Sequence, residues 1–383
     1  MSYTSAQSGD NYRNWWPHPV MTAFTNDSLD ELDRLAAHTG NIFNMKQGGY
    51  LLATRRTDIS ELLGALQDGI DVDVLSGRQV ASRFPHFSPD IRHVLHVRRA
   101  GSIDGHQLGT WMLEQVRASG GRRFQAEVTA IETDRNFSVH IAGARTIRAD
   151  YVVNAAGPFA DRVAGMLGER LPVSNVFQQK VAFEDTRGAI PRDMPFSIDL
   201  DEKRLSWADQ DRSLLADDPQ TRWLTKTMPG GTHCRPDGGA SGTWVKLGWA
   251  YNAKPSEPQQ DLANEPLSDP QFPEIVMRGA AQFIPALLPY VDEPPTRYSH
   301  YGGYYTMTDE NWPLIGPAGP DGAFMVAALS GFGSMAACAA GRLCAAWVTG
   351  GPLPVYANDL SSRRYEDAQL MAALRDSPTK GLL

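Results

Sequence analysis

Residues 301–351 read YGGYYTMTDENWPLIGPAGPDGAFMVAALSGFGSMAACAAGRLCAAWVTGG, and this stretch decides the fold. After a β-turn-β unit, the apolar run over residues 323–330 predicts a strand buried on both faces. A glycine-rich turn over residues 330–334 follows, and residues 335–348 predict a helix rich in Ala and Gly with one charge, Arg342. The stretch therefore predicts a buried strand, a tight turn and a helix.

Two interpretations of this turn stay open from these residues alone. The unpaired N–H groups at a helix N-terminus carry a partial positive charge, so the turn can bind an anion or the polar edge of a cofactor. Alternatively, the small residues let the helix pack closely against its neighbours, and no ligand is involved.

The composition excludes several classes of protein. The chain has 383 residues, enough for two domains, and its net charge is −8 without a run of basic residues, which argues against a nucleic-acid partner. Cys234, Cys338 and Cys344 are scattered, which argues against a disulfide framework or a zinc site and suits a reducing cytoplasm. The sequence shows neither a signal peptide nor an apolar segment of the ~20 residues that span a bilayer, so we expect a cytoplasmic protein without a membrane partner.

The rest of the chain divides into an α/β part and an aromatic-rich part. Residues 98–168 alternate strands and helices and end in YVVNAAGPFADRVAGMLG, a strand, a glycine turn and a helix. This is half of a dinucleotide-binding arrangement, but the chain contains no GxGxxG fingerprint, so the segment alone is weak evidence for a cofactor. Residues 172–300 predict an antiparallel, aromatic-rich sheet in a second domain. The charged helix near the C-terminus is interpreted as a solvated surface element.

Other kinds of catalytic or metal site find little support. His93 and His96 would point to opposite faces of a strand, so we expect no metal site there. Neither a GxSxG elbow nor a P-loop is present. Asp199, Asp201 and Glu202 form an acidic cluster, which is interpreted as a solvated loop because carboxylates are rarely buried.

Four segments in order resemble the glycine/D-amino-acid oxidase superfamily of flavoproteins, which contains monomeric sarcosine oxidase and the dimethylglycine dehydrogenases. SAQSGDNYRNWWP resembles the loop that passes beside the flavin ring, and YVVNAAGPFADRVA resembles the second cofactor strand and turn. YYTMTDENWPLIGP is similar to the return from the substrate sheet, and ALSGFGSMAACAAGRLCA to the last strand, flavin-facing loop and helix. The matches span nearly the whole chain.

The resemblance implies an α/β fold of the α+β type, with an incomplete FAD-binding Rossmann-like domain and an antiparallel-sheet substrate domain. The FAD-binding domain would comprise residues 1–20, 98–168 and 301–350. The substrate domain would comprise residues 21–97 and 169–300, and a tail helix would lie in residues 351–383. The implied activity is oxidation of the C–N bond of an amine, an amino acid or N-methylated amino acid, by hydride transfer to flavin N5 and imine hydrolysis. Oxygen or another acceptor would then take the electrons.

The resemblance also implies roles for individual residues. Arg13 would lie near the flavin and meet a substrate carboxylate. Lys246 matches the lysine that helps oxygen react, because a buried cation stabilises the negative charge that develops there; a strand lysine facing solvent is the alternative. The implied FAD contacts are Val128 at the adenine, Ala156, Gly157 and Pro158 at the ribose and diphosphate, and Gly331, Phe332, Gly333, Ser334 and Met335 at the pyrimidine edge. Candidates for a wall that excludes water, or for plain core, are Trp207, Trp223, Trp244 and Trp249.

Three departures from the family pattern change these expectations. The GxGxxG unit of about 30 residues that grips the ADP moiety is absent, so either Met1 is an internal methionine of a longer protein or the chain binds FAD poorly. Gly303 stands where sarcosine oxidase attaches its flavin through cysteine, so we expect noncovalent FAD. Met335 and Ala250 replace a carboxylate-binding lysine and a histidine, which argues against N-methylglycine as the substrate.

Two alternatives to an amine oxidase stay open. The chain could be a noncatalytic or FAD-deficient truncated family member that acts as a binding subunit of a partner. It could also be a dehydrogenase that passes electrons to a protein acceptor.

Overall fold

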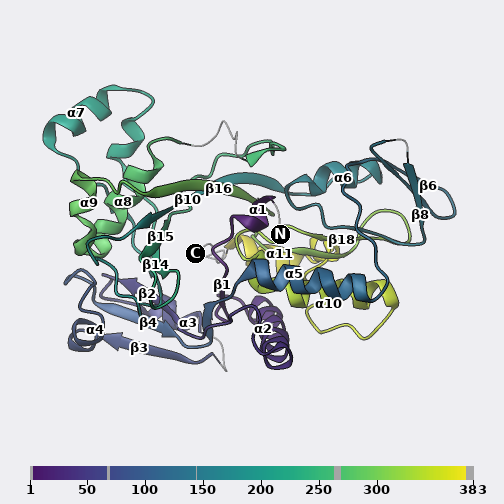
Figure 1. Cartoon of the computed structure of the whole chain (residues 1–383), viewed down its shortest axis with the longest axis horizontal. Coiled ribbons are helices and arrows are strands. Elements are labelled where there is room, and N and C mark those ends of the chain that lie inside the picture. Colours follow the sequence, from purple (N-terminus) through teal and green to yellow (C-terminus); the bar gives the residue numbers. More distant parts are fainter. Residues whose placement is uncertain (1–2, 67–69, 144, 263–268, 377–383) are drawn as a thin grey trace.

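The computed structural model describes residues 3–66, 70–143, 145–262 and 269–376, which form an elongated molecule (Figure 1). Its largest sheet has eight strands, in the order β16 (Tyr298–Met307), β10 (Ser174–Glu184), β15 (Trp244–Gly248), β14 (Thr232–Asp237), β11 (Phe196–Asp199), β2 (Tyr50–Thr54), β4 (His93–Val97) and β3 (Val72–Ser76). Neighbouring strands are antiparallel except β11 and β2. The mixed helix and sheet fold with an antiparallel sheet is therefore confirmed.

Four smaller groups of strands complete the sheets. They are β1 (Asn11–Arg13) with β5 (Ala100–Ser102), β12 (Lys203–Arg204) with β13 (Thr227–Met228), β17 (Leu314–Pro317) with β18 (Ala323–Ala327) and β9 (Val152–Asn154), and β6 (Val128–Thr133) with β7 (Phe137–Ile141) and β8 (Arg145–Ala149). In the group of three that contains β18, this strand runs parallel to β9.

Helices surround these sheets, with α7, α8 and α9 at the left end of Figure 1 and α5, α6 and α10 toward the right. The α-helices are α1 (Tyr3–Ala6), α2 (Pro19–Thr39), α3 (Ser60–Gly64), α4 (Arg78–Arg83), α5 (Gly105–Ala118), α6 (Ala160–Met166), α7 (Asp209–Asp217), α8 (Phe272–Phe283), α9 (Pro289–Asp292), α10 (Gly333–Thr349) and α11 (Ala368–Asp376). Short 3-10 helices are η1 (Gly157–Phe159), η2 (Arg222–Thr225), η4 (Pro285–Leu287) and η5 (Ser362–Glu366). No helix in the described part of the chain is long and apolar enough to cross a membrane.

The two faces of the large sheet have different neighbours because side chains alternate along each strand. One face packs on α8 in an apolar core that includes Leu51, Val181, Phe183, Val245, Leu247 and Ile275. On each strand, the residues that alternate with these apolar ones point to the opposite face of the sheet, toward the start of α10. That second face carries the polar side chains of the candidate site.

The stretch over residues 301–351 folds largely as predicted, with β17, β18, a turn and α10 in succession. The strand β18 ends at Ala327, three residues earlier than expected, because Ala328 and Ser330 adopt left-handed backbone conformations with φ of 57° and 46°. At its other end α10 is closed by Gly350 with φ 66°, a conformation that glycine adopts without strain.

The small residues of α10 do allow close packing, against α2. Ala336, Ala339 and Ala340 are buried in the same cluster as Phe24 and Leu32 of α2. The helices are also joined by hydrogen bonds, because Ser28 Oγ donates to the Met335 carbonyl at 2.6 Å and accepts from the Ala339 N–H at 3.3 Å. The packing interpretation is therefore confirmed for the body of this helix, whereas its N-terminus faces a cavity.

The charged helix near the C-terminus, α11, is a largely exposed element as expected, with Leu374 as its buried residue; residues 377–383 lie outside the described part. The segment just before this helix is not solvated throughout. Arg364 in η5 is fully buried, and its Nε donates to Glu310 Oε1 at 2.6 Å. Its Nη1 also donates to the Pro313 carbonyl at 2.8 Å. The burial of Arg364 could not be seen from its neighbours in the sequence, because its partner Glu310 lies 54 residues earlier in the chain.

Candidate active site

Two adjoining cavities lie between the second face of the large sheet and the start of α10. The sheet cavity, of about 230 Å³, is lined on the sheet side by Tyr50, Lys180, His233, Arg235 and Lys246. The helix cavity, of about 320 Å³, is lined by the turn before α10, by β16 and by Gly157 and Pro158 of η1. The residues that line both cavities, and so mark their junction, are Ser8, Lys180, Tyr305, Ser330, Gly331 and Ser334.

Strand register brings the basic side chains together. Lys180 of β10 lies opposite Gly248 of β15, which in turn lies opposite His233 of β14. Two residues along β15, Lys246 lies opposite Arg235 of β14. Because residues two apart share a face, all four side chains point to the same side of the sheet.

The cations of the sheet cavity differ in their partners. Lys246 Nζ lies 3.3 Å from Asp237 Oδ2, and Arg235 lies 3.3 Å from the other oxygen of this carboxylate. Lys180 has no carboxylate within ion-pair distance among the described residues, and its Nζ donates a long hydrogen bond of 3.4 Å to the Gln7 carbonyl. Burial and the nearby Lys246 lower the pKa of Lys180 to about 8. Burial likewise lowers the pKa of His233 to about 4, so its imidazole is neutral at pH 7.

Arg13 reaches the sheet cavity from β1. Its side chain is buried, its Nε donates to the Trp15 carbonyl at 3.1 Å, and its guanidinium carbon lies 4.9 Å from the centre of the Trp16 ring. Burial lowers the pKa of Arg13, and the nearby Tyr50 opposes this shift. A guanidinium group remains protonated at all physiological pH values, so this is a fixed positive charge in an aromatic wall.

The turn before α10 is held in place from two sides. A Cβ atom on Gly331 would lie 2.6 Å from ring atoms of Tyr305, so the glycine allows this ring to pack directly on the turn. Ser334 Oγ donates to Asp10 Oδ1 at 3.1 Å and lies 2.9 Å from Ser8 Oγ. Asp10 also accepts from the Gly105 N–H at the start of α5 at 3.2 Å. The loop over residues 8–10 is therefore tied to the start of two helices.

The structure gathers most of the residues singled out from the sequence. Arg13, Lys246, Gly331, Phe332, Ser334 and Met335 line the sheet cavity, and Gly157, Pro158, Gly303, Gly331, Gly333 and Ser334 line the helix cavity. Val128 and Ala156 line neither: Val128 packs in an apolar cluster with Val163 and Met166, and the N–H of Ala156 donates to Asn154 Oδ1. Their roles stay predictions, as does the division into domains.

The prediction of a tryptophan wall is wrong. Trp249 is buried in the core on the opposite face of the sheet, and Trp207 and Trp223 pack against that core. Trp244 lies beside Arg297, and none of the four lines either cavity. The aromatic lining of the sheet cavity comes instead from Trp16, Tyr50, Phe196, Tyr305 and Phe332.

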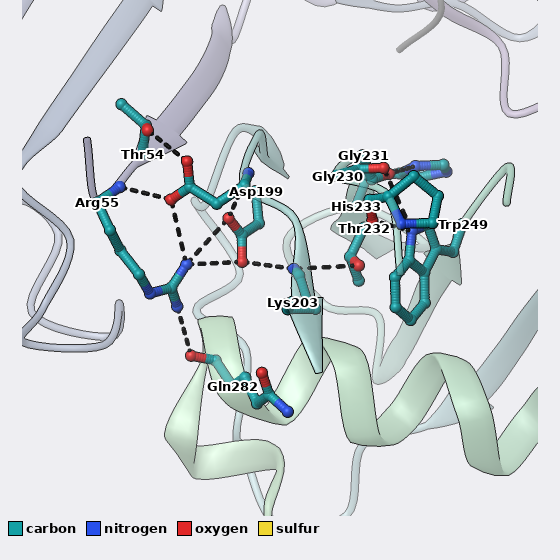
Figure 2. Close-up of polar contacts among 12 residues, drawn as sticks. Thr54, Arg55, Asp199, Lys203, Gly230, Gly231, Thr232, His233, Trp249 and Gln282 are labelled. Atoms are coloured by element: carbon teal, nitrogen blue, oxygen red, sulfur yellow. Dashed lines mark hydrogen bonds and ion pairs between the residues drawn. The ribbon is translucent and has the colours of Figure 1, made fainter. Parts of the chain in front are cut away.

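The interpretation of the acidic cluster as a solvated loop is wrong for Asp199, which is fully buried. Lys203 Nζ donates to Asp199 Oδ2 at 2.6 Å and to Thr232 Oγ1 at 3.3 Å, and Arg55 Nη1 donates to both Asp199 oxygens at 3.0 Å (Figure 2). The network lies on the core face, and Thr232 is next to His233 of the sheet cavity. It therefore supports one wall of the cavity from behind.

Residues 2–347 match the DAO family, described as FAD dependent oxidoreductase. The chain belongs to this family. Among solved structures, it is similar to L-proline dehydrogenase from P. horikoshii, with a TM-score of 0.75 and 18% identity over 96% of this chain and 88% of that chain. It is also similar to glycine oxidase from Geobacillus kaustophilus, with a TM-score of 0.71 and 15% identity over 94% of this chain and 88% of that chain. For iminodiacetate oxidase from Chelativorans sp. BNC1 the TM-score is 0.66, with 17% identity over 91% of this chain and 84% of that chain. No curated protein matches the chain.

The residues around the two cavities fit the ring end of the FAD that this DAO family uses. Asn11 and Trp16 line the sheet cavity, and Asn11 Oδ1 and Trp16 Nε1 are buried without a hydrogen-bond partner in the described part of the protein. The N-cap residue of α10, Phe332, makes no side-chain capping bond, so the first N–H groups of the helix remain available to an anionic or carbonyl edge. Gly331 to Met335 would hold that edge.

Proposed function

We propose that this family member oxidises the C–N bond of a small amine, an amino acid or N-methylated amino acid, with noncovalently bound FAD. The observation that carries this proposal is the junction of the two cavities. A carboxylate-bearing amine suits the sheet cavity, which is small and lined by four cationic side chains and one carboxylate, that of Asp10. The names of the similar solved structures, which mention L-proline, glycine and iminodiacetate, support the same class of substrate.

Arg13 would bind the substrate carboxylate. A guanidinium group can form two parallel hydrogen bonds to a carboxylate, and these are strong where little water competes. Arg13 is only 3% exposed and lies beside Trp16 and Tyr50. Fixing the carboxylate there would direct the C–H bond next to nitrogen toward the junction with the helix cavity, and such orientation contributes several kcal/mol to catalysis.

FAD, when bound, supplies the acceptor for the hydride. The residues of the chain would hold the substrate and exclude bulk water, since Tyr50 and Phe196 line the cavity on the sheet side and Trp16 lines it from the loop after β1. The imine product would then react with water to give the carbonyl compound. Each of these tasks falls to residues that line the sheet cavity.

Noncovalent binding is supported by Gly303, which lines the helix cavity and has no side chain to form a bond. The three cysteines are free and buried, Cys234 on the core face of the sheet and the other two within α10. Free thiols also support a location in the reducing cytoplasm.

An anaerobic titration tests the proposed function. The protein is loaded with FAD, and amino acids and N-methylated amino acids are added while the visible flavin absorption is recorded. We expect bleaching with at least one such amine and not with the corresponding hydroxy acids. Binding of FAD without bleaching by any amine would contradict the proposal and favour the noncatalytic binding subunit.

A dehydrogenase that uses a protein acceptor is the second candidate, and one observation favours it. The ammonium group of Lys246, proposed to help oxygen react, is paired with Asp237 at 3.3 Å, which reduces its free positive charge. In a dehydrogenase, Lys246→Met would leave turnover with an artificial acceptor intact, and oxygen consumption by the unchanged protein would already be negligible. In an oxidase, the same substitution would lower oxygen consumption selectively.

A further inference from the structure

Lys180 has the most central position of the charged groups in the site. It is one of the six residues that line both cavities, and the other five carry hydroxyl groups or, at Gly331, no side chain. The residue opposite it on β15 is Gly248, and the His233 ring lies over this glycine, since a Cβ there would be 2.2 Å from His233 Nε2. Any amine held in the sheet cavity with its reacting carbon at the junction would lie beside the Lys180 ammonium group.

Every element packed around Lys180 contributes a titratable or charged group. From β15 and β14 come Lys246, Arg235 and His233, from the loop before β1 comes Asp10, and from β16 come Tyr301, opposite Lys180, and Tyr305. Lys246 and Arg235 lower the pKa of Lys180 and Asp10 raises it, while Asp237, on the same face of β14, pairs with Lys246 and Arg235. Lys246 differs from Lys180 because its Nζ lies 3.3 Å from a carboxylate oxygen of Asp237.

We propose that Lys180 is the proton acceptor of this site, which takes a proton from the substrate ammonium group so that oxidation begins from the free amine. The inference rests on the proposed function. In this step the N–H bond of the substrate ammonium breaks, its electron pair stays on the substrate nitrogen, and an N–H bond forms at the neutral Nζ of Lys180. The total charge is unchanged and no electron is transferred.

The two lysines would divide their roles according to their surroundings. Burial and Lys246 lower the pKa of Lys180 to about 8, so a substantial fraction of it is neutral at mildly alkaline pH. A group acts best as a base when its pKa is close to the working pH. Lys246 has a different environment because Asp237 pairs with it at 3.3 Å, and such a pair of unlike environments is how sites assign acid and base roles.

Lys180→Arg is the variant that separates a proton acceptor from a mere positive charge, because arginine is always charged. We expect kcat/KM of the unchanged FAD-loaded enzyme to fall about tenfold per pH unit below pH 8. In Lys180→Arg and Lys180→Met, kcat/KM at pH 8 should fall at least tenfold, and the break near pH 8 should move up to the pKa of the substrate amine. Lys246→Arg is the matched control and should keep the break near pH 8.

A direct titration supplies a readout other than activity. Lysine side-chain NMR signals of the FAD-loaded protein should include one that titrates near pH 8, and Lys180→Arg should remove it. A Lys180 signal that titrates near the ordinary value of about 10.5, or a Lys180→Arg enzyme with an unchanged pH profile, would overturn the inference. If no amine bleaches the flavin at all, the proposed function fails instead, and the role of Lys180 as its proton acceptor fails with it.

Discussion

The ammonium nitrogen of Lys203 lies 2.6 Å from a carboxylate oxygen of Asp199, and neither side chain is more than 5% exposed. Arg55, directly after β2, binds the same carboxylate, so three segments meet at one buried charge. Asp199 also accepts a backbone hydrogen bond from Gly231 at 2.7 Å, and Gly231 lines the sheet cavity. The core face of the sheet thus holds a wall of the site in place (Figure 2).

Breaking this pair should cost more stability than breaking an exposed one. Lys203→Met leaves the Asp199 charge with one partner fewer, and removal of one member of a buried pair costs about 3–5 kcal/mol. Arg170→Met is the control, because Arg170 is 89% exposed and pairs with Asp161 at 3.6 Å, an interaction worth about 1 kcal/mol or less. Urea unfolding measures the free energy of unfolding of both variants. Equal losses in the two would show that the buried network adds no more stability than an exposed ion pair.

Gly331→Ala should weaken FAD binding without unfolding the protein. The new Cβ would lie 2.6 Å from ring atoms of Tyr305, so the turn or the ring must move, at a cost of about 1–3 kcal/mol. Because both line the helix cavity, we expect the Kd for FAD to rise at least about tenfold, which equals about 1.4 kcal/mol. Fluorescence titration with FAD provides the measurement.

A glycine within α10 itself, Gly341, is the control for this substitution. Gly341 has no atom within 4 Å of a Cβ position, and Gly→Ala in a helix interior stabilises by roughly 0.5–1 kcal/mol. Gly341→Ala should therefore leave FAD affinity unchanged and raise stability slightly. If both variants bound FAD equally well, the turn would not be part of the cofactor site.

The parts of the fold that depend on local sequence could be predicted. The turn and helix after β18 are encoded within some 25 residues, and they form in the expected order. Lys246 and Arg13 could be proposed because each lies in a short segment that resembles the family. The early end of β18 could not, since nothing in the sequence marks the left-handed conformations of Ala328 and Ser330.

Residues whose roles depend on long-range pairing were not predictable. Lys180 joins the site only through the register of β10 on β15, and because β10 also carries Ser, Asn, Gln and Glu, the sequence did not single this lysine out. Asp199 looked solvated because Arg55, which binds it, lies 144 residues away. The buried pair of Arg364 and Glu310 was missed for the same reason, because its two residues lie 54 positions apart in the sequence.

Arg364→Lys tests the buried pair in the C-terminal segment. Lysine keeps the charge but cannot reach both Glu310 and the Pro313 carbonyl, which Arg364 contacts at 2.6 and 2.8 Å. We expect a loss of about 3 kcal/mol in the free energy of unfolding, since a buried carboxylate loses part of its pairing. Arg363→Lys, at the exposed neighbouring position, should change it by less than about 1 kcal/mol; a similar loss in both would argue against a specific role for the pair.

The pH dependence of stability offers a test of Lys180 that needs no substrate. Its folded-state pKa is lowered from 10.5 to about 8, so between these pH values the unfolded chain binds a proton that the folded chain lacks. The free energy of unfolding contributed by this group therefore rises with pH across that window, by up to about 3 kcal/mol. Lys180→Met should be more stable than the unchanged protein below pH 8, and this advantage should shrink as the pH approaches 10.5. Lys180→Arg should keep the low stability throughout, because it stays charged. Parallel curves for the unchanged protein and Lys180→Met from pH 7 to 10.5, measured by urea unfolding, would show that Lys180 is not held in an environment that disfavours its charge.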